Sequence, residues 1–405
     1  AVVVSVPPLA RKTIGATGAL RRRSMGRRRS SRVAAAAFAV ALAVAVAVTG
    51  VLPTALGYVC RGGYDGPVNF AQLQSHKVSE ASGLASSIAN EGILWTHEDQ
   101  GKDPKLYAVS LKSNPPGEIV AIIDLHPWTK RHKESPDFED IALAKCPHTD
   151  EYCIWLGDIG DNCARLQSDG KPHSLDCGSS YYLYAVPEPE IRDHDSVLKE
   201  KARDVFEVEL EYPFTGEYPN IAMDSEALVV SPDGSKAWLI EKRLMQAKPW
   251  DRPTPARIYE TSQNLTLVPS SVSIPLKLST IIDNPDGVRI TGADLHPTGE
   301  DLIVRTAYHG GTYLYTFDVP FDFKTIQFRG RLASNSLRQP QPEAVTFDFT
   351  NVEPAQFGKA FWHISEQSQG WQNLEYVRCK DDLQQLQVRG IMSPYRNVHL
   401  AAVAG

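Results

Sequence analysis

The chain has 405 residues, of which 22% are charged and 42% hydrophobic, and a formal net charge of −6. Nine of its 42 basic residues precede Val33, whereas the first acidic residue is Asp65, so the remainder is more acidic than the total. An acidic body argues against nucleic acids as partners and is compatible with cation binding. The chain also lacks a dinucleotide fingerprint and a Gly-x-Ser-x-Gly elbow, which excludes nicotinamide, flavin and serine-elbow chemistry.

Residues 1–57 have the composition of a targeting region. Arginines between Arg21 and Arg32 precede an apolar run over residues 33–52, and small residues at 55–57 offer a cleavage site. This order predicts a secretory signal peptide. An apolar run of about 20 residues would also span a bilayer, so an uncleaved signal anchor is the alternative. Both place residues 58–405, a single predicted domain, in an oxidising compartment, either secreted or held at a membrane only by that segment.

Five modules follow from Val78 onward, and each opens on a short apolar strand that contains or follows a carboxylate. The openings lie at residues 80–84, 138–142, 224–228, 291–295 and 342–345. Second strands with polar ends follow at residues 93–99, 154–158, 237–242, 302–306 and 361–366. Third strands are predicted by alternating Tyr, Val and Ile at residues 105–109, 182–186, 257–260, 312–316 and 374–377.

Repeated all-strand modules of this length predict an all-β fold, the β-propeller. Fourth strands are expected at residues 119–124, 205–210 and 271–276, and one short helix near residues 196–201. Five openings indicate five blades, or six if the long second module hides a hairpin. Residues 68–73 are expected to supply the outer strand of the last blade, so that the two ends of the domain close the ring.

Propeller geometry predicts one polar funnel. The first strand of each blade lines the centre, and antiparallel pairing brings the end of the second strand beside its start. Hard oxygen ligands from several blades suit Ca²⁺, although these acids would serve equally well as turn caps. The predicted metal ligands are Glu80, Glu139, Glu226, Asp294 and Glu343, together with Asp158 and Asp161 in a glycine-rich loop.

Candidates for catalysis are the polar residues at the ends of second strands. They are His97, Glu98, Asp99, Lys242 and Arg305. The chemistry expected of them is hydrolysis or elimination at a cation-held site, with the basic side chains contacting an anionic group. The sequence therefore predicts an exported cation-dependent hydrolase of a small anionic or phosphorylated substrate. The alternative is a non-catalytic extracellular propeller that binds a small molecule or a glycan, and we expect a monomer in either case.

The six cysteines are even in number and lie at loop-like positions, which predicts disulfides. Proximity favours Cys146 with Cys153 and Cys163 with Cys177, and leaves Cys60 with Cys379 to join the two ends of the domain. The sequon at Asn264 predicts N-glycosylation if it lies on an exposed loop.

The succession of motifs resembles a group of secreted bacterial β-propeller proteins, most of them uncharacterised, over nearly the whole chain after Val78. The motifs lie at residues 94–99, 138–142, 157–162, 184–189, 225–228, 291–294 and 342–344. The acidic openings at Glu80 and Glu343 are more loosely similar to calcium-activated nucleotidases, which are five-bladed propellers with a central Ca²⁺ and a signal anchor. That similarity implies hydrolysis of nucleoside diphosphates, but the nucleotide-binding residues of that family cannot be placed on this chain.

Overall fold

Alternating aromatic and β-branched residues form strands in all five predicted modules. The computed structural model describes residues 60, 63–74, 78–99, 103–129, 136–160, 181–213, 224–242, 255–284, 287–307, 310–335, 341–366 and 372–380. All of these belong to one unit, Gly57–Gly405. The predicted targeting region, residues 1–57, lies outside them, as do Asp161, Cys163 and Cys177. No helix in the described ranges is long and apolar enough to cross a bilayer.

Each predicted first, second and third strand is present. The first strands are β2 (Ala81–Ser86), β6 (Phe138–Lys145), β11 (Ser225–Val230), β15 (Ile290–Leu295) and β19 (Pro342–Phe347). The second strands are β3 (Ile93–Glu98), β7 (Tyr152–Asp158), β12 (Ala237–Glu241), β16 (Asp301–Thr306) and β20 (Phe361–Ser365). The third strands are β4 (Lys105–Ser110), β8 (Tyr181–Pro187), β13 (Ala256–Thr261), β17 (Gly311–Phe317) and β21 (Asn373–Val377).

Outer strands complete the sheets. They are β5 (Glu118–Asp124), β10 (Phe206–Glu211), β14 (Val272–Ile282), β18 (Ile326–Ser334) and β1 (Val68–Gln72). Hydrogen bonds define four sheets in the described residues, because β10 and β14 pair in parallel and join two four-stranded groups into one eight-stranded sheet.

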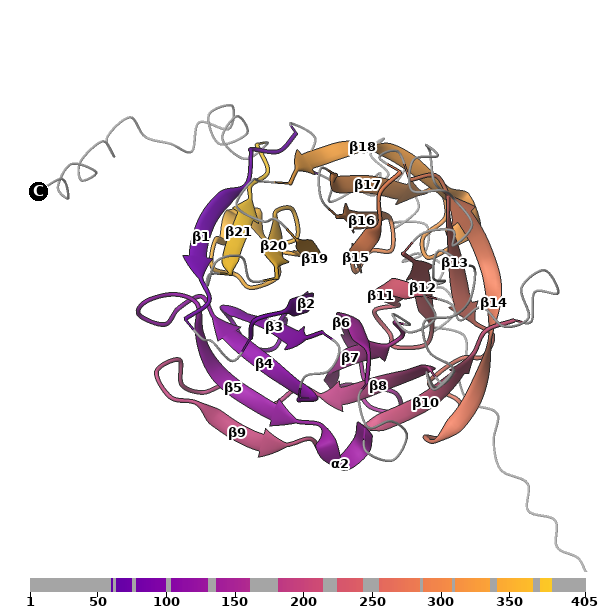
Figure 1. The fold of residues 1–405 in the computed structure, drawn as a ribbon, viewed down its shortest axis with the longest axis horizontal. Helices are drawn as coiled ribbons and strands as arrows, with labels where there is room; N and C mark the ends of the chain where they lie inside the picture. Colours follow the sequence, from indigo (N-terminus) through magenta and orange to yellow (C-terminus); the bar gives the residue numbers. More distant parts are fainter. Residues whose placement is uncertain are drawn as a thin grey trace, which may run out of the picture. The chain divides into compact units, whose positions relative to one another are not determined.

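The first strands of all groups lie innermost, around one centre (Figure 1). β2 contacts β6, β6 contacts β11, β11 contacts β15, β15 contacts β19, and β19 contacts β2. Antiparallel sheets packed radially in this way form a β-propeller, so the predicted all-β propeller class is confirmed.

The two ends of the domain meet in the last sheet. β1 pairs antiparallel with β21, Tyr64 bridges to Cys379, and a disulfide joins Cys60 to Cys379. Strand and disulfide therefore close the ring together, as predicted. A second disulfide joins Cys146 to Cys153 across the β6–β7 turn.

One local expectation is wrong, and three short helices and the strand β18 were not predicted. Residues 196–201, predicted as a helix, instead contain β9 (Leu198–Lys201), which pairs in parallel with the edge of β5. Tertiary pairing overrides the weak helix propensity of this short stretch. The helices α2 (His126–Thr129), η2 (Phe323–Thr325) and η3 (Pro354–Gln356) are too short to leave a periodic pattern. The side chains of β18 are mostly exposed, so it shows no apolar alternation.

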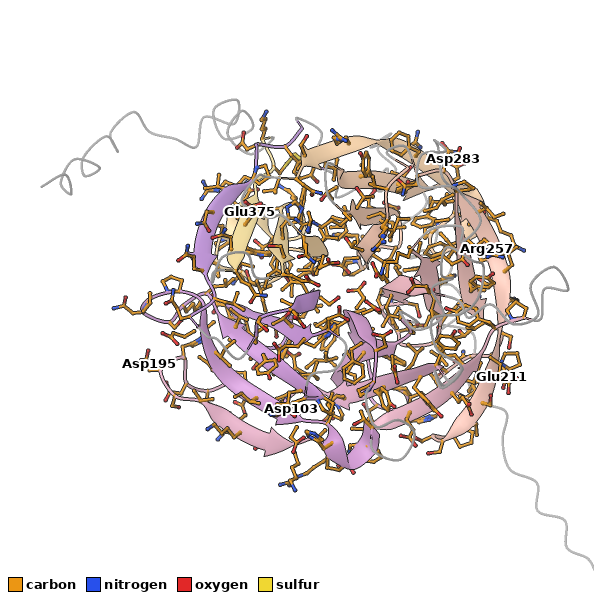
Figure 2. The ribbon with its side chains drawn as sticks, viewed as in Figure 1. Asp103, Asp195, Glu211, Arg257, Asp283 and Glu375 are labelled. Carbon is orange, nitrogen blue, oxygen red and sulfur yellow. A yellow bond between two sulfur atoms is a disulfide. The ribbon has the colours of Figure 1, made fainter. Side chains whose placement is uncertain are left out.

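The apolar cores lie between neighbouring four-stranded groups. A tryptophan of each of four second strands is fully buried there: Trp95, Trp155, Trp238 and Trp362. Figure 2 places the labelled acids Asp195, Glu211 and Asp283 toward the outer parts of the sheets, away from the centre. The carboxylates that concern the site lie instead at the starts of the inner strands and directly after second strands.

Candidate functional site

The inner strands share an irregularity at their starts. In four of them the pairing register skips one residue, which is Glu139 in β6, Glu226 in β11, Thr291 in β15 and Glu343 in β19. In β2 the pairing passes over residues 82 and 83. A bulge leaves its extra residue out of the ladder and re-aims the side chain.

All four of these bulge residues line a single cavity of about 270 Å³. Its other walls come from residues that follow second strands and from loops before first strands. The full lining is Asp99, Glu139, Glu226, Lys242, Arg289, Thr291, Ala307, Gln341, Glu343 and Glu366. Five carboxyl groups therefore face two basic side chains.

One wall of the cavity gathers acids at metal-binding distances. Asp99, Asp137 and Glu139 each offer one oxygen, and these atoms lie within 4.8 Å of one another. Glu139 is only 2% exposed, and its Oε1 has no hydrogen-bond partner in the described residues. Burial, followed by the charges of Asp99 and Asp137, raises the pKa of Glu139 well above its usual value. A Cβ at Gly160 would collide with the Glu139 carboxylate, so the glycine leaves room for it.

A second group of acids shares Glu139 with the first, but it includes a cation. Glu139, Asp224 and Glu226 also offer oxygens within 4.8 Å of one another. Lys242 forms an ion pair with Glu226, and its Nζ lies 3.8 Å from Asp224 Oδ2. The buried ammonium therefore offsets the charge of Glu226 and Asp224, and it also acts on Glu139 through its charge.

Two further carboxyl groups line the cavity at β19 and after β20. Burial, then the charge of Glu366, raises the pKa of Glu343 well above its usual value. Burial, then the charges of Asp99 and Glu80, raises the pKa of Glu366 to about 7, while a hydrogen bond from Gln341 opposes the shift. One of these groups therefore exchanges a proton near neutral pH.

The predicted ring of five acids needs correction at two positions. Asp294 does not line the cavity; its Oδ2 accepts from Phe347 N at 2.8 Å and from Thr346 Oγ1 at 2.9 Å, which ties β15 to β19. Burial raises the pKa of Asp294 to about 7. The residue that the β15 bulge turns inward is Thr291. Glu80 precedes β2 and acts on the cavity through its charge, without being among the lining residues.

Asp158, the first acid of the predicted glycine-rich loop, is the last residue of β7 and contacts the segment that carries Asp137. Asp158 is buried and accepts from Asp137 N at 2.8 Å, which fixes the main chain that carries Asp137. Asp158 is not among the residues that line the cavity. The other loop acid, Asp161, lies outside the described residues.

Three predicted catalytic residues lie outside the lining of the cavity. His97 is fully buried, its Nδ1 lies 3.0 Å from the Glu98 carbonyl, and burial lowers its pKa to about 4. The Glu98 carboxylate accepts from Ser79 N at 2.8 Å and from Ser79 Oγ at 3.1 Å. None of His97, Glu98 and Arg305 lines the cavity, in contrast to Asp99 and Lys242.

Arg305 is completely buried beside the last sheet. Its Nη1 donates to the carbonyls of Ala344 at 2.6 Å and Ile364 at 3.0 Å, and burial lowers its pKa to about 10. Its guanidinium therefore joins β16 to β19 and β20. It is not placed to contact a ligand in the cavity.

Comparison with known proteins adds no family. No protein-family model and no curated protein matches the chain. Among solved structures, a luciferin-regenerating enzyme matches at 11% identity and a TM-score of 0.34, covering 78% of this chain and 96% of that one. A calcium-binding protein, regucalcin, from Agrobacterium tumefaciens matches at 11% identity and a TM-score of 0.35, with the same coverage. Raptor from Chaetomium thermophilum matches at 8% identity and a TM-score of 0.38, covering 79% of this chain and 29% of that one. The propeller assignment rests on the strand pairing described above.

Sequence reasoning missed Arg289 and Gln341, which line the cavity, and Asp137 and Asp224, which belong to the acid groups beside it. Arg289, Gln341 and Asp137 lie in the segments before β15, β19 and β6, and Asp224 stands directly before β11. Alignment of the strand starts offers the missing signal, because the residue before Gly292 occupies the place of the glutamate before Ala344. That alignment finds Thr291, whereas the search for a carboxylate selected Asp294.

Proposed function

We propose that the chain is an exported five-bladed propeller that binds Ca²⁺ in its central cavity and hydrolyses a small anionic substrate there. The observation that carries the proposal is the buried Glu139 carboxylate. It lies beside Asp99 and Asp137, and its Oε1 has no hydrogen-bond partner in the described residues. The blade count follows from five inner strands in a closed cycle of contacts, with the eight-stranded sheet counted as two blades.

The donor set fits a hard cation. Asp99, Asp137 and Glu139 present only oxygen, the ligand that Ca²⁺ takes in sets of about six to eight with tolerance for irregular geometry. Three side chains leave positions for water and substrate, and the adjacent cavity of about 270 Å³ has room for both. Glu226 and Glu343, also predicted as ligands, line the same cavity and are reserved in this proposal for the ion pair with Lys242 and for proton transfer.

A bound cation would polarise a substrate oxygen and stabilise charge that develops on it. Two side chains of the cavity, Lys242 and Glu366, supply a positive charge and a proton-transfer group. Lys242 is held by Glu226 and Asp224 and keeps a positive charge at the cavity wall. Glu366, whose pKa is raised to about 7, gives or takes a proton at the operating pH.

A non-catalytic binding protein is the second candidate. It is favoured by the burial of His97, which removes the predicted histidine base from the cavity. The same cation site would then hold a small-molecule or glycan ligand without turnover.

The test uses the protein as it is secreted by an expression host, with its disulfides intact. After treatment with chelator, calorimetric titration should show binding of one Ca²⁺ per chain. Asp137→Asn should weaken that binding at least tenfold, and Glu200→Asn, on the exposed strand β9, should leave it unchanged. Absence of Ca²⁺ binding to the folded protein would refute the proposal. Release of phosphate or acid from a panel of phosphate esters and nucleoside diphosphates separates the hydrolase from the binding protein.

Export and glycosylation belong to the same proposal. Asn264 is exposed, and its Oδ1 accepts from Thr266 N at 2.8 Å and Thr266 Oγ1 at 2.7 Å, so the amide nitrogen faces away from the turn. We expect one N-linked glycan there in a glycosylating host. Glycosidase treatment should reduce the mass of the secreted protein, and Asn264→Gln should abolish that change. Sedimentation of the same sample should show a monomer.

A further inference from the structure

Two basic side chains line the cavity, and of these only Lys242 forms ion pairs within the described residues. Arg289 is half-buried, and within the described residues its guanidinium makes no hydrogen bond or ion pair. Five carboxyl groups line the same cavity, yet none of them lies within ion-pair distance of Arg289. A half-buried guanidinium without a partner keeps several N–H donors available in a planar fork, which matches an oxyanion.

A second unpaired donor lies two residues further along the chain. Thr291 is the bulge residue of β15 and is 2% exposed, and its hydroxyl has no partner in the described part of the chain. Leaving a buried hydroxyl unpaired costs free energy, so a ligand that accepts a hydrogen bond from Thr291 gains binding free energy. Three other inner strands place a glutamate at this position, so the threonine also removes a negative charge from this wall. The small side chain of Ala307 lines the cavity beside it.

We propose that Arg289 and Thr291 form an oxyanion subsite that holds the anionic group of the substrate, a phosphate or a carboxylate. This names the substrate class for the proposed hydrolase and to that extent rests on the proposed function. The anion subsite itself requires only the two donors. It lies in the same cavity as Asp99 and Glu139, so one small ligand can contact both the cation side and the anion side.

The two sides are coupled by charge. Carboxyl groups outnumber basic side chains five to two in the cavity lining, which disfavours an anion in the empty cavity, and a divalent cation at Asp99, Asp137 and Glu139 would offset that negative charge. Coupling is reciprocal, so the anion must strengthen cation binding by the same factor. We expect orthophosphate to bind the calcium-loaded protein at least tenfold more tightly than the chelated protein.

The experiment titrates orthophosphate and, separately, acetate into the secreted protein with and without Ca²⁺. Arg289→Gln should weaken binding of the preferred anion at least tenfold, and Thr291→Val should weaken it about threefold or more while leaving the melting temperature equal or higher, because the buried hydroxyl is unpaired. The matched control is Arg192→Gln, which removes an exposed arginine paired with Glu190 and should change neither affinity. The arm that binds more tightly identifies the source as phosphate or carboxylate.

Unchanged affinity for both anions in folded Arg289→Gln would overturn the subsite. If that variant does not fold, Arg289→Lys, which keeps the charge and loses the planar fork, should weaken binding severalfold, and affinity equal to that of the wild type would overturn the inference. If Ca²⁺ does not bind but anion binding still depends on Arg289, the subsite stands and the cation-dependent hydrolase fails. If Ca²⁺ binds and no anion does, the subsite alone fails.

Discussion

We expect Glu139→Gln to be more stable than the wild type in chelator and less stable than the wild type in Ca²⁺. In chelator, the wild-type carboxylate is buried near Asp99 and Asp137 with Oε1 unpaired in the described residues. Relief of an unsatisfied buried group is worth about 1–3 kcal/mol, more for charged groups. Because 1 kcal/mol shifts the melting temperature of a domain of this size by about 2 °C, we expect the variant to melt about 2–6 °C higher.

Calcium should invert this difference. At a free concentration of about 100 times the dissociation constant, binding stabilises the wild type by about 2.7 kcal/mol, or about 5 °C, and the variant gains little. Differential scanning calorimetry with chelator and with Ca²⁺ measures all four values, and Glu200→Gln on β9 is the control with equal charge change. A variant that melts below the wild type in chelator would show that Glu139 is satisfied. An equal calcium shift in both proteins would show that Glu139 is no ligand.

Three further predictions concern pH, the buried arginine and the ring closure. In chelator, the native state keeps a proton at Glu366 up to pH about 7, whereas the unfolded chain loses it near the ordinary pKa. The melting temperature should therefore fall as pH rises toward about 7 and level off above it, and Glu366→Gln should flatten this dependence. Arg305→Ala leaves two buried carbonyls without their donor and should lower the free energy of unfolding by about 2–4 kcal/mol in urea titrations. Its calcium affinity should be unchanged, and a loss of affinity in the folded variant would contradict a purely structural role. Replacement of Cys60 and Cys379 together by serine removes a link across 319 residues and should cost roughly 2–5 kcal/mol in the same titrations, whereas an unchanged midpoint would show that β1 and β21 close the ring without it.

The sequence predicted the strands well because each one carries its own signal. Alternation of tyrosine, valine and isoleucine located β4, β8, β13, β17 and β21, and turn residues separated them. Ring closure followed from an argument about chain ends, and both β1 and the disulfide from Cys60 confirm it. β18 was not predicted because most of its side chains are exposed or only partly buried, which leaves no clear apolar alternation.

The site was predictable only in part, because it depends on the phase of each inner strand. Period-2 alternation fixes which side chains share a face until a bulge shifts the phase by one residue. Glu139, Glu226 and Glu343 are acids at the bulge itself and were found. Asp294 lies three residues beyond the β15 bulge and joins β15 to β19 instead. Arg289 precedes its strand, where no periodicity restricts the direction of a side chain.

The parallel pairing of β10 with β14 links two neighbouring blades through the main chain. It joins the sheet that carries Glu139 to the sheet that carries Glu226 and Lys242 by continuous main-chain hydrogen bonds. The sheets that contribute Thr291 and Glu343 meet their neighbours without such a join in the described residues. We therefore expect relative movement of the blades to be smallest between Glu139 and Glu226, and larger on the anion side, where a ligand could change the width of the cavity.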